Sequence, residues 1–399
     1  MAKLTIDDLQ LKDKTVLIRV DFNVPLNDQQ EITDDFRIRA ALPTIKKVLE
    51  DGGKAVLCSH LGRPKGERVP EMSLKPVALR LSQLLEKDVK FADDCIGEEV
   101  LQLKKTLKSG EVLLLENLRY HKAETKNDPE FAKQLAEGCD LYINDAFGSA
   151  HRAHASTEGV THYFEQCAAG YLMEKEIKYL GSAVENPERP FVTILGGAKI
   201  SGKIDVINNL LDKADVLLIG GGMVFTFFKA QGKEIGNSLL EEDRIEMARE
   251  ILQKAEKSNC KLVLPSDVVV ADEIDAAATT QVVSVDEIPE GWMGVDIGPA
   301  TVAEFKEILD NAKTVVWNGP MGIFEIKPFS MGTEDIARHL AEITTKGATT
   351  IVGGGDSAAA AKAFGISDQL SHVSTGGGAS LEFLEGKVLP GVAALTDKN

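Results

Sequence analysis

Short runs of aliphatic residues alternate with amphipathic segments along the whole of this chain. The runs consist largely of Val, Ile and Leu and lack polar residues at every second position, which is typical of strands that are covered on both faces. They lie at residues 15–22, 54–60, 111–117, 140–147, 191–197, 215–223, 261–270, 313–317, 349–355 and 370–375. Because strands that alternate with helices pair in parallel through right-handed crossovers, the pattern predicts an α/β fold.

The segments between these runs carry apolar residues at helical spacing. Residues 34–50 are an example, with an apolar stripe formed by Ile38, Leu42, Ile45 and Leu49. Another helix is predicted at residues 239–257, where Asn237 or Ser238 is a suitable N-cap. We therefore expect helices to cover the predicted sheets.

The chain has 399 residues, which is more than one hydrophobic core usually serves, so two domains are expected. A predicted helix at residues 171–184 and a stretch with two prolines at residues 185–190 mark the boundary, because prolines end a helix. We expect a first domain over residues 1–169, a connecting helix and linker over residues 170–189, and a second domain from residue 190. Each of these similar-sized domains is expected to hold a parallel sheet flanked by helices, a Rossmann-like arrangement.

The net charge of −17 argues against nucleic acid or an anionic membrane as a partner. Positive charge is nevertheless concentrated, because eight of the twelve arginines precede residue 153. The longest uncharged runs contain about 13 residues, too few to span a bilayer, and the first residues lack the apolar stretch of a signal peptide. Five cysteines without a C-x-x-C pair are typical of reduced thiols. These features predict a soluble cytoplasmic protein.

Polar and cationic residues follow the predicted strands of the first half. They are Asp21, Phe22 and Asn23 after the first strand, His60, Leu61, Gly62 and Arg63 after the second, Asn117 and Arg119 after the third, and Arg152 beyond the fourth. In doubly wound sheets, ligands bind beyond the carboxyl ends of the strands. One such turn is explained by the exposure of loops, whereas four in register favour a binding site. With Arg37, the arginines suit a compact anion that is gripped from several sides.

The second half carries glycine-rich turns in place of cations. They lie at residues 196–199, 220–222, 353–357 and 376–378. Backbone N–H groups at helix starts suit a nucleotide polyphosphate, and Asp356 is placed either to ligate a hard cation or to cap a helix. The triplet at residues 220–222 is explained equally by an adenine ring against it or by a tight turn. A chain with both kinds of site suggests transfer of a phosphoryl group between two molecules.

Residues 197–203 match the pattern G-x-x-x-x-G-K that begins a P-loop. The next residue is Ile204, where a P-loop requires the Ser or Thr whose hydroxyl holds Mg²⁺. Lys199 and Lys203 are four residues apart, so on a helical first turn both ammonium groups would face the same side. Two solvated lysines on a helix are an equally good interpretation of that pair taken alone.

Five blocks of mixed chemistry resemble the phosphoglycerate kinase family, in the family's order. They read RVDFNVP at residues 19–25, SHLGRP at 59–64, GGAK at 196–199, WNGPMG at 317–322 and GGGDS at 353–357. The resemblance covers essentially the whole chain. It implies a glycolytic enzyme, a monomer, that transfers a phosphoryl group reversibly from 1,3-bisphosphoglycerate to ADP, with Mg²⁺, giving 3-phosphoglycerate and ATP.

The resemblance also implies how the chain is organised for this reaction. A second domain at residues 190–383 would bind the nucleotide, and a tail at residues 384–399 would return to the first domain, which binds 3-phosphoglycerate. In-line transfer would follow closure of the two domains about the hinge helix. A glycerate carboxylate is already ionised near neutral pH and needs no general base, so the enzyme's task is alignment and charge neutralisation.

Site residues follow from the resemblance, position by position. The substrate-binding residues are Asp21, Phe22, Asn23, Arg37, His60, Leu61, Gly62, Arg63, Arg119 and Arg152, with His60 and the last three arginines on the 3-phosphate. The nucleotide-binding residues are Lys203, Gly220, Gly221, Gly294, Asn318, Pro320, Glu325, Gly354, Gly355, Asp356 and Ser357, with Glu325 on the ribose and Asp356 as the Mg²⁺ ligand. The catalytic residues are Arg37, Lys199, Lys203, Gly376, Gly377 and Gly378. At Gly202, relatives often carry an acidic residue.

Three other classes of protein are disfavoured by the sequence. A P-loop NTPase would need Ser or Thr in place of Ile204. A nicotinamide dehydrogenase would need G-x-G-x-x-G at the first helix of either half, and neither half has it. A non-catalytic nucleotide-binding module would not need the arginines of the first half.

Overall fold

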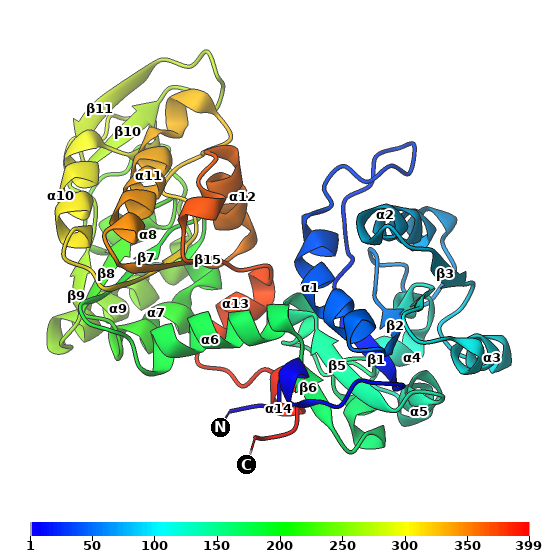
Figure 1. Cartoon of the computed structure of the whole chain (residues 1–399). Helices are drawn as coiled ribbons and strands as arrows, with labels where there is room; N and C mark the ends of the chain where they lie inside the picture. The colour runs from blue at the N-terminus through cyan, green and yellow to red at the C-terminus, as the bar shows by residue number, and fades with distance from the viewer. Residues whose placement is uncertain (1, 399) are drawn as a thin grey trace. The chain divides into compact units, whose positions relative to one another are not determined.

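The computed structural model describes residues 2–398 and divides the chain into two compact units. Unit 1 contains the residues up to Ile177 together with those from Val388 onwards, and unit 2 runs from Lys178 to Lys387. The first division falls inside helix α6 (Tyr171–Glu185). Figure 1 shows the helices and strands of both units, coloured from blue at the N-terminus to red at the C-terminus.

In the described part of unit 1, a six-stranded parallel sheet has the order β3-β4-β2-β1-β5-β6. Its strands are β1 (Thr15–Val20), β2 (Lys54–Cys58), β3 (Val89–Ala92), β4 (Val112–Leu115), β5 (Leu141–Asp145) and β6 (Cys167–Ala169). Besides α6, its helices are α1 (Phe36–Glu50), α2 (Lys75–Leu85), α3 (Glu98–Thr106), α4 (Lys122–Thr125), α5 (Pro129–Ala136) and α14 (Pro390–Ala393). The strand order changes direction at β1, which has β2 on one side and β5 on the other.

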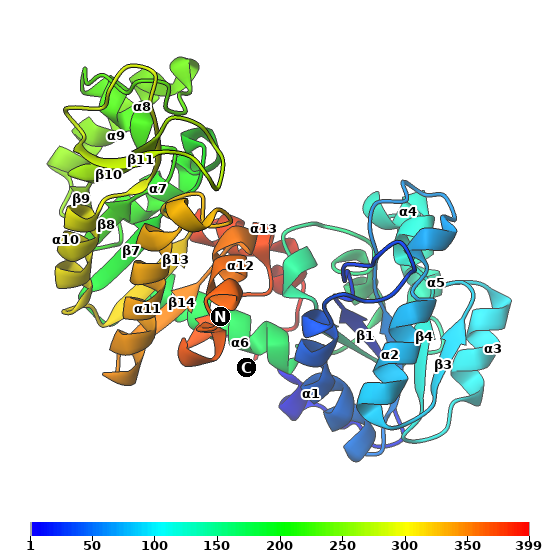
Figure 2. The same ribbon diagram turned by 90° about the horizontal axis from the view of Figure 1, so that it is seen from above.

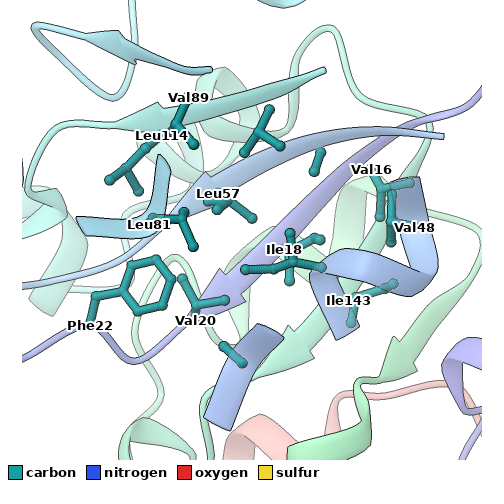
Figure 3. Close-up of a cluster of buried hydrophobic side chains, with 14 of the residues drawn as sticks. Val16, Ile18, Val20, Phe22, Val48, Leu57, Leu81, Val89, Leu114 and Ile143 are labelled. Atoms are coloured by element: carbon teal, nitrogen blue, oxygen red, sulfur yellow. The ribbon is translucent and has the colours of Figure 1, made fainter. Parts of the chain in front are cut away.

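The aliphatic runs form this sheet because both of its faces are covered. Every residue of β1 is buried, as a strand in the middle of such a sheet requires. Figure 3 shows one face, where Val16, Ile18 and Val20 of β1 meet Leu57 of β2, Val48 of α1 and Leu81 of α2. The stripe predicted for residues 34–50 supplies Ile38 and Ile45 of α1 to the same core.

In the described part of unit 2, another six-stranded parallel sheet has the order β15-β14-β13-β7-β8-β9. Its strands are β7 (Phe191–Leu195), β8 (Val216–Ile219), β9 (Lys261–Val263), β13 (Thr314–Asn318), β14 (Thr349–Val352) and β15 (His372–Val373). The helices are α7 (Ile204–Leu211), α8 (Val224–Ala230), α9 (Ile245–Lys257), α10 (Pro299–Leu309), α11 (Met331–Thr345), α12 (Gly355–Ala363) and α13 (Gly377–Leu384). Helices α10, α11 and α12 lie along one face of the sheet (Figure 2), and their apolar residues share a core with those of the strands.

Unit 2 also contains a three-stranded antiparallel sheet that was not predicted. Its order is β11-β10-β12, formed by β10 (Asp267–Ala271), β11 (Thr280–Ser284) and β12 (Met293–Ile297). The single strand predicted at residues 261–270 is wrong, because β9 and β10 belong to different sheets and Pro265 lies between them. β11 escaped prediction because its residues are half-buried or exposed and carry little aliphatic signal.

The start predicted for the helix at residues 239–257 is also wrong. Helix α9 begins at Ile245, and Arg244 is its N-cap residue. Ser238 instead accepts a hydrogen bond at its Oγ from the backbone N of Gly294 (2.8 Å). Ser238 does make a side-chain hydrogen bond, but its partner lies on β12, far along the chain, and not at the start of a helix.

The predicted fold class is confirmed: the chain is α/β, with two parallel six-stranded sheets flanked by helices in the described residues. Among residues 2–398, no helix is long and apolar enough to cross a membrane.

Helix α6 begins on a buried carboxylate. Asp145, at the end of β5, accepts hydrogen bonds at Oδ1 from the backbone N of Leu172 (2.9 Å) and Met173 (3.2 Å). A Cβ at Gly170 would lie 2.3 Å from that oxygen, so only glycine allows the helix to start this close. Burial raises the pKa of Asp145 to about 6. The native state therefore binds this proton more tightly than the unfolded chain does.

This linkage predicts how stability changes with pH. A raised folded-state pKa gives a contribution that is complete below about pH 4 and is lost as the pH rises through about 6. Asp145→Asn removes the titration and keeps an acceptor oxygen. From pH 4 to 7.5, its unfolding free energy should rise relative to the parent protein by roughly 2–3 kcal/mol. Urea unfolding across this range measures the difference.

The control is Asp128→Asn, which changes the half-exposed carboxylate that caps α5 by accepting from the backbone N of Phe131 (3.0 Å). It should not gain stability over its parent as the pH rises. Parallel stability–pH curves for the parent and Asp145→Asn would contradict the assignment.

Candidate active site

Unit 1 contains a cavity of about 470 Å³ whose wall is rich in cations. It is lined by Arg63, Lys65, Gly66, Arg119, His121, Lys122, Thr125, Arg152 and His154. Three of the arginines predicted for an anion site are thus brought together. They come from the segments that follow β2, β4 and β5, at one edge of the parallel sheet.

Short polar contacts hold the loops of this cavity. Asn117, two residues beyond β4, accepts at Oδ1 from the backbone N of Arg119 (3.0 Å) and of Leu61 (3.2 Å). The Arg119 Nη1 donates to the carbonyl of Gly62 (2.8 Å), and the backbone N of Gly62 donates to Asn23 Oδ1 (2.8 Å). Asn23 therefore fixes the loop that carries Arg63, while Arg63 itself is exposed.

Arg37, in the first turn of α1, forms an ion pair with Asp21. The distance from Arg37 Nη1 to Asp21 Oδ2 is 2.8 Å, and the arginine side chain is one-third exposed. The side chains of Phe22 and Leu61 lie in the core, and their backbone N–H groups donate to Ser59 Oγ (2.8 Å) and Asn117 Oδ1 (3.2 Å), so these two predicted site residues hold the loops in place.

A buried arginine whose charge acts on the cavity-wall residues Arg119 and His154 was not singled out from the sequence. Arg19, on β1, is fully buried; its Nε donates to Ser156 Oγ (2.9 Å), and its Nη2 lies 3.1 Å from His60 Nδ1 and donates to Ser149 Oγ (3.3 Å). A guanidinium can only donate, so Nδ1 of His60 is the acceptor. A neutral His60 therefore carries its proton on Nε2.

Electrostatics reinforce this state of His60. Burial and then the neighbouring Arg19, Arg119 and Arg37 charges lower its pKa well below the ordinary value. The same two effects lower the pKa of His154 to about 4 and that of Arg119 to about 10. So dense a set of cations around buried groups favours an anionic ligand, which would relieve their mutual repulsion.

A buried carboxylate balances part of this charge. Glu124 accepts from the backbone N (2.9 Å) and Oγ (2.6 Å) of Ser156, the residue that also bonds to Arg19. Burial raises the pKa of Glu124, and the charge of Arg19 acts in the opposite direction. Neither residue stands out in the sequence, because a charged residue in a strand or a short helix looks like a surface position.

Unit 2 contains a cavity of about 400 Å³ with a different lining. Apolar side chains such as Val224, Phe225, Leu239 and Met321 line it together with the backbone of glycine turns. Predicted site residues in its wall are Gly221, Gly294, Pro320, Glu325 and Asp356. A mostly apolar cavity with a few polar groups is typical of a site for a flat organic ligand.

The turns that form this cavity interlock through their backbones. The N–H of Gly197 donates to the carbonyl of Pro320 (2.9 Å), and the N–H of Gly221 donates to the carbonyl of Met321 (2.9 Å). A Cβ at Gly221 would lie 2.4 Å from the backbone N of Gly197, and its φ is +70°. Glycine is required there by close approach and by backbone conformation. The turns follow β7, β8 and β13, where the strand order of this sheet reverses.

Lys203 and Asn318 meet next to this cavity. Lys203 Nζ donates to Asn318 Oδ1, while the buried Nδ2 of Asn318 has no hydrogen-bond partner among the described residues. Burial lowers the pKa of Lys203 to about 8, partly offset by the charges of Asp356 and Glu385. A desolvated ammonium and an unused amide donor are both groups that an anion would satisfy.

Two predicted glycine turns lie side by side at the starts of α12 and α13. A Cβ at Gly377 would be 3.3 Å from the backbone N of Gly355. Gly355 and the exposed Asp356 open α12, and Ser357 Oγ accepts from the backbone N of Gly319 (2.5 Å). Gly376 is the N-cap residue of α13. The N–H groups of two helix starts are therefore close to Asp356.

The helical-turn interpretation of Lys199 and Lys203 is wrong. Lys199 is exposed and extended (φ −129°, ψ 131°), a 3₁₀ turn follows at Ile200–Gly202, and α7 begins at Ile204. Gly197, with φ +105°, turns the chain after β7. Lys199 is then the N-cap residue of the 3₁₀ turn, and Lys203 is that of α7.

Comparisons with known proteins agree with one another. The sequence model of the family described as phosphoglycerate kinase matches residues 6–387. The phosphoglycerate kinase of Chloroherpeton thalassium is 60% identical over 397 residues, and that of Gloeothece citriformis 59% identical over 400 residues, each covering 100% of both chains.

Solved structures give the same result. The phosphoglycerate kinase of Coxiella burnetii has a TM-score of 0.90 at 44% identity, and that of Pyrococcus horikoshii has a TM-score of 0.84 at 34% identity. Each comparison covers 98% of this chain and 98% of the other. With both sequence and structure matched over nearly its whole length, the chain belongs to the phosphoglycerate kinase family.

Proposed function

We propose that this member of the family transfers a phosphoryl group reversibly from 1,3-bisphosphoglycerate to ADP, giving 3-phosphoglycerate and ATP. The observation that supports it most is the pair of unlike cavities, one lined by cations in unit 1 and one lined by glycine backbone and apolar side chains in unit 2. The enzyme is a phosphotransferase with a carboxyl group as acceptor. We further propose that it acts as a monomer in the cytoplasm.

In unit 1, the cation-lined cavity is proposed to hold the 3-phosphate. Arg63, Arg119 and Arg152 would form charge-assisted hydrogen bonds to its oxygens. His60 would donate through Nε2, since Arg19 occupies its Nδ1. The remaining glycerate groups would contact Asp21, Asn23, the backbone of residues 61–62, and Arg37, which is partly exposed beside Asp21.

In unit 2, the apolar cavity is proposed to hold adenosine. Gly221 and Gly294 would present backbone to a flat ring, and Glu325 would accept from a ribose hydroxyl; the predicted Gly220 is buried and lies outside the lining. Pro320 belongs to the same wall, while Lys203, Asn318 and the turn at residues 354–357 would bind the phosphates.

Asp356 is a suitable ligand for a hard cation. Its exposed carboxylate stands at the first turn of α12, next to the N–H groups that open α13. Oxygen donors of this kind are those that Mg²⁺ prefers in phosphate sites. When bound with the nucleotide, Mg²⁺ would neutralise charge on the transferring phosphates.

The proposed chemistry needs positioning and charge neutralisation. In the direction that consumes ATP, the carboxylate of 3-phosphoglycerate is ionised at neutral pH and would attack the γ-phosphorus of ATP without a general base, with ADP as the leaving group. Arg37, Lys199 and Lys203 would stabilise the equatorial oxygens, together with the N–H groups of Gly376, Gly377 and Gly378. The P-loop alternative is less well supported, because Ile204 offers no hydroxyl and a 3₁₀ turn precedes α7.

We expect ATP consumption to require both 3-phosphoglycerate and Mg²⁺. A separate cavity is proposed for each substrate, and the proposed chemistry uses no base that would activate water. ATP alone should therefore not be hydrolysed rapidly. Coupled-enzyme assays with ATP alone, ATP with 3-phosphoglycerate, and the same without Mg²⁺ measure this. Rapid ATP hydrolysis that is unchanged by 3-phosphoglycerate would favour the P-loop alternative.

Arg63→Ala and Arg37→Ala should differ in their kinetic effects. Arg63 would hold a phosphate that does not react, so its loss should raise the KM for 3-phosphoglycerate roughly 10–100-fold with a smaller effect on kcat. Arg37→Ala and Lys203→Ala remove donors to the transferred group and should lower kcat by roughly 10²-fold.

The matched control is Arg39→Ala, on the same helix as Arg37, which removes an exposed arginine paired with Asp35. It should leave both parameters within about twofold, as surface pairs contribute little. An Arg37→Ala variant that changes KM alone would refute its assigned role.

Transfer in line requires reacting atoms about 3–3.5 Å apart. Because the two cavities belong to different units, we propose that units 1 and 2 close around both substrates about α6. Small-angle scattering should give a smaller radius of gyration for the ternary complex than for the free enzyme or either binary complex. Equal values in all four states, with full activity, would exclude closure.

A further inference from the structure

Asp296 lies in the wall of the unit 2 cavity yet belongs to no set of residues assigned above. It stands on β12, two residues beyond Gly294, and is 4% exposed. Its Oδ2 accepts from the backbone N of Gly332 (2.6 Å), in the first turn of α11, and its Oδ1 accepts from the backbone N of Ile297 (2.9 Å). One carboxylate therefore joins the cavity strand to the start of α11.

The chain packs directly against this carboxylate from two sides. A Cβ at Gly322 would lie 2.3 Å from Asp296 Oδ1, and a Cβ at Gly332 would lie 2.5 Å from the same atom. Both glycines are needed for close approach, not for an unusual φ. The loop at residues 319–325, which carries Pro320 and Glu325, thus lies against Asp296.

Thr333 completes the same clamp. Its Oγ1 accepts from the backbone N of Met321 (3.0 Å) and of Gly322 (3.2 Å), so the loop is tied to α11 one residue after the helix bonds to Asp296. The backbone N of Ile323 donates to the carbonyl of Val295 on β12 (3.0 Å). Strand, loop and helix form a closed set of contacts around the carboxylate.

Burial raises the pKa of Asp296 to about 7, and the N–H groups of Gly332 and Ile297 act in the opposite direction. One oxygen of Asp296 accepts from α11 and the other from the next residue of its own strand, and a single hydroxyl cannot make both contacts in the same geometry.

We propose that Asp296 is a positioning residue for the nucleotide: it fixes the spacing between Gly294 and the 319–325 loop, and thereby the width of the cavity that receives adenosine. This inference rests on the proposed function, since it takes the cavity to be the adenosine site. It goes further by assigning nucleotide affinity to a residue that need not touch the nucleotide.

The chain supplies a matched control in Asp267. This carboxylate on β10 caps α10, accepting from the backbone N of Thr301 (2.8 Å) and of Ala300 (3.0 Å). A Cβ at Gly298 would lie 2.2 Å from its Cγ, so a glycine packs on it as well. Asp267 is buried, but it is not part of the cavity wall. Both aspartates hold the start of a helix, but only Asp296 lies in the cavity wall.

The test compares Asp296→Asn with Asp267→Asn. An amide cannot accept from both Gly332 and Ile297, so Asp296→Asn should weaken MgADP binding about tenfold or more. Binding of 3-phosphoglycerate should change less than about twofold, because its cavity lies in unit 1. Asp267→Asn removes a buried helix cap and should lower the melting temperature about as much as Asp296→Asn does. Its affinities for MgADP and 3-phosphoglycerate should stay within about twofold of the parent's. Isothermal titration of each folded variant gives all four values.

A second pair keeps the test decisive if Asp296→Asn does not fold. Thr333→Val preserves shape and removes the acceptor for Met321 and Gly322, so MgADP binding should weaken. Thr333→Ser restores an acceptor oxygen and should restore most of the affinity.

The outcomes separate the two proposals. If the parent protein does not bind MgADP, the proposed function fails and this inference fails with it. If the parent binds and Asp296→Asn or Thr333→Val binds equally well, only the inference is overturned. Equal weakening in Asp267→Asn also overturns it, because the effect would then be general destabilisation.

Discussion

Parallel pairing of the central strands is the constraint on which the rest of this molecule depends. Each unit is built on a parallel sheet, so the carboxyl ends of its strands meet at one edge. In unit 2, the turns after β7, β8 and β13 meet where the strand order reverses, and they form the wall of the apolar cavity. In unit 1, the segments after β2, β4 and β5 bring Arg63, Arg119 and Arg152 to one cavity. Parallel pairing thus brings segments that are far apart in the sequence to one edge of each sheet, where they form the two cavities.

The two proposed sites would bind phosphate through different groups. Unit 1 concentrates guanidinium groups and must hold them against their own repulsion, which buried Glu124 and the hydrogen bonds of Arg19 offset. Unit 2 relies on backbone N–H groups, which carry no net charge, and on the desolvated ammonium of Lys203. Such a difference suits a small, highly charged ligand on one side and a larger, partly apolar one on the other.

Much of the fold, and the gathering of Arg63 and Arg119 at one cavity, could be predicted because the signals are local. Aliphatic runs gave the central strands, and the polar residues directly after them gave Arg63 and Arg119. The antiparallel sheet was missed because β11 is largely polar and half-exposed, so burial left little pattern in its sequence.

Arg19, Glu124 and Asp296 were missed for a different reason: each is a buried charge whose partners lie far along the chain. Arg19 bonds to Ser156, and Asp296 bonds to Gly332, through contacts that only the folded chain creates. The resemblance to a family located the groups proposed to touch ligands. It did not show what holds them in place.

We expect the two substrates to bind to different units, glycerate phosphate through side chains and nucleotide through turns. Hydrogen–deuterium exchange measured with each ligand alone can show where each one binds. 3-Phosphoglycerate should slow exchange at residues 60–66, 117–125 and 150–157, and MgADP should slow it at residues 197–203, 220–225, 293–297 and 319–325. Protection of the first set by MgADP alone, or of the second by 3-phosphoglycerate alone, would contradict the account.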